Sequence, residues 1–148
     1  MIELTCCPST LQKGFSTYSP VALKELFNSQ KVNHILPYNG MDNNETEQKE
    51  FQDNNKHMSI SGAQQKYSLV VDNGQMRLSL EQEQATLLLK TKLSEYANKE
   101  ISPANEHLTM QIASQVYNIP TAANGLCFFQ NDEPAYICLL YTSPSPRD

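Results

Sequence analysis

The chain has 148 residues, a net charge of −5 at pH 7 and 39% hydrophobic residues. This length fits one domain, or one domain with a small appendage, and the acidic balance argues against a broad nucleic-acid-binding face. No stretch of about 18 apolar residues occurs, so no membrane span is expected. The first residues lack the basic and apolar regions of a signal peptide, and we therefore expect a cytoplasmic protein.

The first 56 residues read as an N-terminal segment with one short helix and a polar linker. Ser19 and Pro20 form a helix-start signal, with serine as N-cap and proline in the first turn. The helix is expected to end near Asn28, and four residues are predicted to share its buried face: Val21, Leu23, Leu26 and Phe27. Residues 39–56 are polar and predict a solvated helix or a mobile linker, in which only Phe51 could bury well.

A β-hairpin is predicted next. Residues 66–71 are rich in β-forming residues, and Asn73-Gly74 is a strong two-residue turn signal before a return strand at 75–80. The third strand, 85–90, is almost continuously apolar, which predicts burial on both faces. It ends in Lys90, and a buried lysine needs an anionic partner or a route to water.

The clearest helix is predicted at 104–118, opened by Ser102-Pro103. Its expected buried stripe is Leu108, Ala113, Ile112 and Val116. Glu106 lies in the first turn, where a carboxylate meets the positive end of the helix dipole, and helix-end electrostatics alone could explain it. Two further strands, 126–129 and 134–137, complete a β-β-β-α-β-β order and an α+β fold.

The segment 57–71 reads as a polar loop that leads into a strand. Its serines offer hydroxyl groups, its small residues leave the backbone accessible, and its lysine brings positive charge. Such a loop can surround a phosphate with backbone N–H groups. With only one glycine in the loop, a serine-containing turn before an ordinary hairpin is the alternative interpretation. A lysine on a paired strand, Lys90, and a helix carboxylate, Glu106, would convert the loop into a nucleotide site.

These elements in this order resemble a protein-kinase small lobe, and three motifs resemble HipA-type serine/threonine kinases, the toxins of a bacterial toxin–antitoxin system. The resemblance covers about residues 7–137. The motifs are the phosphate loop Met58-Ser59-Ile60-Ser61-Gly62-Ala63-Gln64-Gln65-Lys66-Tyr67-Ser68-Leu69, the helix motif Pro103-Ala104-Asn105-Glu106-His107-Leu108-Thr109-Met110-Gln111-Ile112-Ala113, and the strand Glu133-Pro134-Ala135-Tyr136-Ile137. One departure is Thr91-Lys92-Leu93, because the family usually has a proline soon after the lysine.

The resemblance implies a kinase that transfers the ATP γ-phosphoryl group to a protein and is regulated by autophosphorylation on the nucleotide loop. It implies that ATP is bound with Mg²⁺ in the full-length parent, that a protein substrate such as an aminoacyl-tRNA synthetase is the target, and that an antitoxin is a candidate partner. It implies autophosphorylation at Ser59 and Ser61. The nucleotide-binding residues that it implies are Ser61, Gly62, Ala63, Gln64, Gln65, Lys66, Lys90 and Glu106.

The four cysteines, Cys6, Cys7, Cys127 and Cys138, form no Cys-x-x-Cys pair and are expected to be free thiols. Some HipA-like relatives begin with a cysteine-rich metal knuckle, but only Cys7 stands at a matching place. No metal site is therefore predicted.

Residues 138–148 break the family pattern and match the translation of a transposon-type sequencing adaptor. We therefore expect the small lobe to span 57–137, the tail to be adaptor-derived or a disordered Ser/Pro segment, and the natural protein to continue past Ile137. The family's catalytic Asp and Mg²⁺ ligands belong to a second, larger lobe, so this fragment is expected to be inactive by itself. Two other interpretations remain: a non-catalytic binding module or antitoxin-like partner of a separate kinase, and a structural α+β domain without a ligand.

Overall fold

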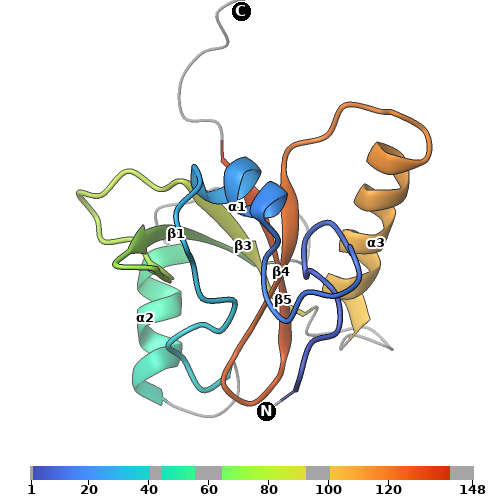
Figure 1. Ribbon diagram of the computed structural model, residues 1–148. Coiled ribbons are helices and arrows are strands. Elements are labelled where there is room, and N and C mark those ends of the chain that lie inside the picture. The colour runs from blue at the N-terminus through green and yellow to red at the C-terminus, as the bar shows by residue number, and fades with distance from the viewer. Residues whose placement is uncertain (1, 41–44, 56–64, 93–100, 141–148) are drawn as a thin grey trace, which may run out of the picture.

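The computed structural model describes residues 2–40, 45–55, 65–92 and 101–140. These residues form an α+β fold in which helices pack around one antiparallel sheet (Figure 1). The elements are α1 (Pro20–Phe27), α2 (Glu45–Asn55), β1 (Lys66–Asp72), β2 (Gln75–Leu78), β3 (Leu87–Lys90), α3 (Ser102–Gln115), β4 (Asn124–Phe128) and β5 (Pro134–Leu139). The five strands lie in the order β2-β1-β3-β5-β4. No helix in these ranges is long and apolar enough to cross a membrane.

The predicted first hairpin is confirmed. β1 and β2 are antiparallel, with Asp72 opposite Gln75. Asn73 and Gly74 make the two-residue turn with positive φ angles of 51° and 76°, as a type I′ turn requires. β1 is also the antiparallel neighbour of β3, so the hairpin is joined directly to the strand that carries Lys90.

Helix α1 begins and ends where the sequence predicts. The Ser19 hydroxyl accepts a hydrogen bond from the Ala22 N–H, and Asn28 ends the helix in the left-handed conformation. The predicted buried face is partly wrong, because Val21 is 54% exposed. The inward stripe consists of the pairs Ala22/Leu26 and Leu23/Phe27, each four residues apart, and Val21 lies on the opposite side of this helix.

The N-terminal segment shares one hydrophobic core with the sheet. Buried Cys7, Tyr18 and Leu36 belong to the same cluster as Leu69 and Ile137. The polar stretch before the first strand contains helix α2, which matches the helical alternative of the prediction.

Phe51 anchors helix α2 in this core, as the prediction that it could bury requires, and is only 2% exposed. Its ring lies 5.1 Å from that of Tyr38, 4.9 Å from that of Tyr67 and 6.0 Å from that of Phe129, measured between centroids. One aromatic side chain therefore joins α2 both to the residues that precede it and to the sheet.

Strand β3 is buried on one face only, which corrects the prediction that both faces are buried. Leu87 and Leu89 are fully buried, whereas Leu88 and Lys90 are only partly buried. Although the strand sequence is almost all leucine, its side chains alternate between a buried and a more open face of the sheet, and Lys90 lies on the open face.

Helix α3 presents a different face to the protein from the one predicted. Three residues of the expected stripe are exposed, 49% for Leu108, 42% for Ile112 and 65% for Val116, whereas the fourth, Ala113, is partly buried. The residues of this helix that are buried are Pro103 and His107. The inward side is chosen by hydrogen bonds to the N-terminal loop and β4, described below, rather than by the apolar periodicity.

Candidate functional site

The side chains of Lys90 and Glu106 form an ion pair between the last residue of β3 and α3. Because α3 begins at Ser102, Glu106 is its fifth residue and lies beyond the first turn, which corrects the predicted position. Lys90 Nζ lies 2.7 Å from Glu106 Oε2, and the side chains are 20% and 29% exposed. The ammonium group also lies 5.6 Å from the centre of the Tyr136 ring, on β5. The lysine at the end of β3 therefore has the anionic partner that its position demands, and it remains reachable from solvent.

A second lysine stands beside this pair. Lys66, the first residue of β1, is directly opposite Lys90 in the sheet register. Both lysines lower the pKa of the Cys138 thiol, although burial outweighs them and the pKa is raised, and Glu106 raises it further. Directly opposite residues of paired strands lie on the same face of a sheet, so Lys66 and Lys90 share the face on which Lys90 meets Glu106.

A further ion pair lies just beyond the ends of β3 and β5. Lys92 Nζ is 3.4 Å from Glu133 Oε1, and the side chains are 16% and 11% exposed. The other oxygen of this carboxylate, Glu133 Oε2, is buried without a hydrogen-bond partner. Among the described residues, three lysines and two glutamates thus lie near one end of the central strands, and lysine side chains are groups that bind anions.

The structure brings together some of the predicted site residues and does not describe others. Lys66, Lys90 and Glu106 share one region of the sheet, and exposed Gln65 immediately precedes β1. The remaining predicted residues lie outside the described part of the chain: Ser59, Ser61, Gly62, Ala63 and Gln64. The autophosphorylation and phosphate-loop assignments therefore stay predictions.

All four cysteines are free thiols, as predicted. The Cys7 sulfur accepts hydrogen bonds from the backbone N–H groups of Ser9, Thr10 and Ser19 at 3.3–3.4 Å. Burial raises the pKa of Cys7, but the hydrogen bonds outweigh it and the pKa is lowered. Across the described ranges, no three His, Cys, Asp or Glu side chains gather into a group that could hold a metal ion.

His107 is a structurally important residue that the sequence interpretation missed. It is 2% exposed, and its Nε2 atom lies 2.7 Å from the carbonyl oxygen of Ser9, which fixes Nε2 as the protonated nitrogen. Burial lowers the pKa of this imidazole and favours the neutral form. Its spacing of four residues from both Pro103 and Gln111 is the signal that could have identified the inward face of α3.

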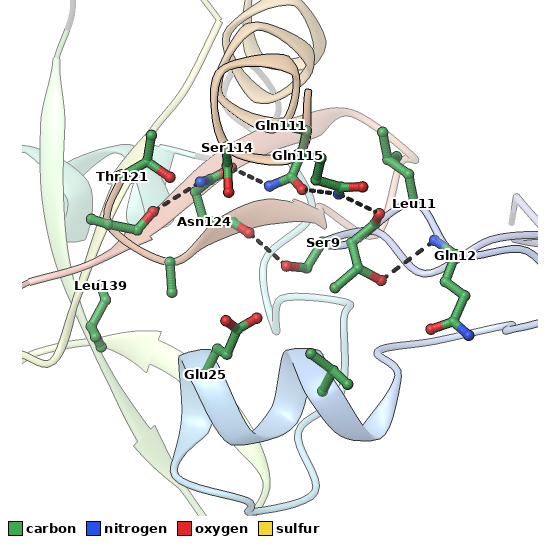
Figure 2. Close-up of a pocket in the computed structure, with 14 residues that line it drawn as sticks. Ser9, Leu11, Gln12, Glu25, Gln111, Ser114, Gln115, Thr121, Asn124 and Leu139 are labelled. Carbon is green, nitrogen blue, oxygen red and sulfur yellow. Dashed lines mark hydrogen bonds between the residues drawn. The ribbon is translucent and has the colours of Figure 1, made fainter. Parts of the chain in front are cut away.

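A hollow of about 780 Å³ is the second feature that the sequence did not indicate. It lies between the N-terminal loop, α1, the C-terminal half of α3 and the start of β4 (Figure 2). Neither Lys90 nor Glu106 lines it. The hollow and the Lys90–Glu106 pair are therefore two separate candidate sites.

No protein-family model matches the chain, and no curated protein is significantly similar to it.

Proposed function

We propose that the chain is the N-terminal part of a HipA-like toxin serine/threonine kinase, whose parent transfers the γ-phosphoryl group of ATP to a protein. The observation that carries the proposal is the 2.7 Å pair between Lys90 on β3 and Glu106 on α3. In protein kinases, a lysine on the third strand contacts the nucleotide phosphates and a helix glutamate holds it in place. The α+β fold and the strand order accommodate such a pair.

The two facing lysines support a phosphate ligand. Lys66 and Lys90 face each other across β1 and β3, although like charges directly opposite destabilise a sheet. The phosphates of ATP would bring negative charge next to both lysines, and the loop before Lys66 would contribute backbone N–H groups.

The proposed reaction is phosphoryl transfer from ATP to a hydroxyl group of the substrate. The substrate hydroxyl attacks the γ-phosphorus of ATP, its proton passes to a catalytic Asp, and ADP leaves with the bonding electrons. The catalytic Asp and the ligands of Mg²⁺ would come from the larger lobe that this family has, while Lys90 would orient the phosphates. Phosphorylation of Ser59 or Ser61 would add negative charge to the loop and repel the ATP phosphates.

The proposed partners follow from the same resemblance. They are a protein substrate with an acceptor serine or threonine, for which an aminoacyl-tRNA synthetase is the family's example, and an antitoxin protein. A non-catalytic binding module would have no need of the Lys90–Glu106 pair or the phosphate loop, so loss of phosphoryl transfer on changing either distinguishes the two functions.

The test is autophosphorylation of the protein expressed from the complete source locus, with radiolabelled ATP and Mg²⁺. We expect Lys90→Ala to reduce incorporation by about 100-fold, which is the usual cost of removing one preorganised electrostatic contact. Lys24→Ala, which changes an exposed lysine on α1, should have no effect. We expect Ser59→Ala to lower the amount of phosphate incorporated. An inactive wild-type protein, or full activity in Lys90→Ala, would contradict the proposal.

A further inference from the structure

The hollow beside α3 has the size and the walls of a small-ligand site. Its volume of about 780 Å³ lies within the usual range of about 300–1,000 Å³ for such sites. Figure 2 shows residues of the N-terminal loop and α3 along its upper wall and Glu25 of α1 on the opposite side. Five separate segments of the chain meet there, so the hollow depends on the tertiary fold.

One wall is a chain of hydrogen-bonded amides. Gln115 Nε2 donates to the Thr10 carbonyl at 2.9 Å and to Gln111 Oε1 at 2.6 Å. Gln111 Nε2 donates to Asn124 Oδ1 at 3.0 Å, and Asn124 Nδ2 donates to the Ala122 carbonyl at 2.9 Å (Figure 2). These contacts fix the direction of each amide and leave acceptor capacity on the oxygens, so the wall is preorganised to receive hydrogen-bond donors.

The hollow has negative charge and no positive charge. The Glu25 carboxylate projects from α1 toward the amide wall (Figure 2) and has no hydrogen-bond or ion-pair partner within the described ranges. None of the 14 lining residues is lysine, arginine or histidine. The C-terminal turn of α3, with Ser114 and Gln115, adds the negative end of a helix dipole.

Apolar groups complete the lining. Leu11 is 38% exposed and Val21 is 54% exposed, and Leu139 lies at the end of the hollow away from Leu11 (Figure 2). These side chains offer an aliphatic surface next to the carboxylate. The hollow therefore suits a ligand that combines a cationic head with a short hydrocarbon stem.

We propose that this hollow binds a guanidinium group on an aliphatic stem. A guanidinium ion is planar, carries five N–H donors and pairs with a carboxylate in bidentate fashion, so it can engage Glu25 and the fixed amide oxygens together. The same chemistry is offered by a free alkylguanidine and by an arginine side chain of a peptide. The proposal is independent of phosphoryl transfer, because it involves neither Lys90 nor Glu106.

Calorimetric titration of the 148-residue protein tests the proposal. The probes are N-butylguanidine and N-acetyl-arginine amide, each compared with its neutral urea counterpart, N-butylurea or N-acetyl-citrulline amide. Saturable binding of either guanidinium probe, at least about tenfold tighter than its urea counterpart, is the expected result, because charge-assisted hydrogen bonds exceed neutral ones by this margin. Tighter binding of the arginine amide would indicate a peptide as the source, and tighter binding of butylguanidine a free small molecule.

Three variants separate the site from general charge effects. Glu25→Gln should weaken guanidinium binding by about tenfold or more, and Ser114→Tyr should fill the hollow and block it. Glu3→Gln removes the same charge from an exposed position outside the hollow and should leave binding unchanged. Equal binding of the urea probes, unchanged affinity in Glu25→Gln, or no saturation up to millimolar probe would overturn the proposal.

Discussion

Asn54 joins helix α2 to β1 and to the residue that follows β2, and replacing it with alanine should lower the free energy of unfolding. The Asn54 side-chain oxygen accepts from the Ser68 N–H at 2.8 Å, and its NH₂ group donates to the carbonyls of Ser68 and Ser79 at 3.2 Å and 3.1 Å. In the register of the hairpin, Ser79 lies opposite Ser68, but β2 ends one residue earlier, at Leu78. The Ser68 N–H therefore lacks the strand carbonyl that would otherwise accept its hydrogen bond. The amide of Asn54 takes over that role.

The expected magnitude follows from these contacts. Asn54 is 7% exposed, so alanine would leave the Ser68 N–H poorly satisfied, at a cost of about 1–3 kcal/mol. In the variant, the Ser68 carbonyl would still accept a hydrogen bond from the Ser79 N–H, at 3.0 Å. Loss of the bonds from the Asn54 NH₂ group therefore adds less to the destabilisation. We expect a total loss of about 2–3 kcal/mol, which corresponds to a decrease of about 5–10 °C in the melting temperature of a domain of this size.

Urea unfolding followed by circular dichroism measures this loss. Gln52→Ala is the matched control, because Gln52 is exposed on the same helix, and it should change stability by about 0.5 kcal/mol or less. Asn54→Asp should be at least as harmful as alanine, since it keeps the acceptor for the Ser68 N–H but brings a negative charge next to two carbonyl oxygens. If Asn54→Ala and Gln52→Ala unfold at the same urea concentration, the bridging role of Asn54 is wrong.

Three further predictions concern single contacts. Gly125→Ala should lower stability by about 1–3 kcal/mol in urea unfolding, because the added Cβ would lie 3.0 Å from Ser9 Cβ and 3.1 Å from its Cα; an unchanged midpoint would show that the N-terminal loop yields freely. His107→Gln should flatten the pH dependence of unfolding below pH 6.5, since burial lowers the pKa of His107 and the unfolded state takes up the proton first, so wild-type stability falls as the pH falls. Hydrogen bonds from Arg77 lower the pKa of Glu83 from 4.5 to about 2, so the stability from this carboxylate is complete above its unfolded pKa and is lost as the pH falls through that window. Unfolding titrations of Glu83→Gln should lack this part of the acid loss, and a slope equal to that of the wild type would refute the assignment.

The features that the sequence predicts well are those set by local contacts. The serine N-cap and Asn28 define α1 within its own residues, and Asn73-Gly74 adopts the positive φ angles that its turn requires. The meeting of Lys90 and Glu106 was predictable for a different reason. A lysine at the end of an apolar strand needs an anionic partner, and the kinase-like order of the elements pointed to Glu106 as that partner.

The features that it predicts poorly depend on contacts distant in the chain. The apolar spacing of Leu108 and Ile112 indicated the wrong face of α3, because the inward side is chosen by hydrogen bonds from His107 to Ser9 and from Gln115 to Thr10. These partners lie about a hundred positions apart in the sequence, and periodicity within one helix carries no information about them. The hollow beside α3 was unforeseen for the same reason.

The central claim, that the Lys90–Glu106 pair serves phosphoryl transfer, is tested most directly by comparing activity with stability in one variant. In the protein from the complete locus, we predict that Lys90→Met lowers autophosphorylation by about 100-fold or more. Its free energy of unfolding should change by only about 1 kcal/mol or less, because both side chains retain access to solvent, with exposures of 20% and 29%. Autophosphorylation equal to that of the wild type in folded Lys90→Met protein would contradict the claim.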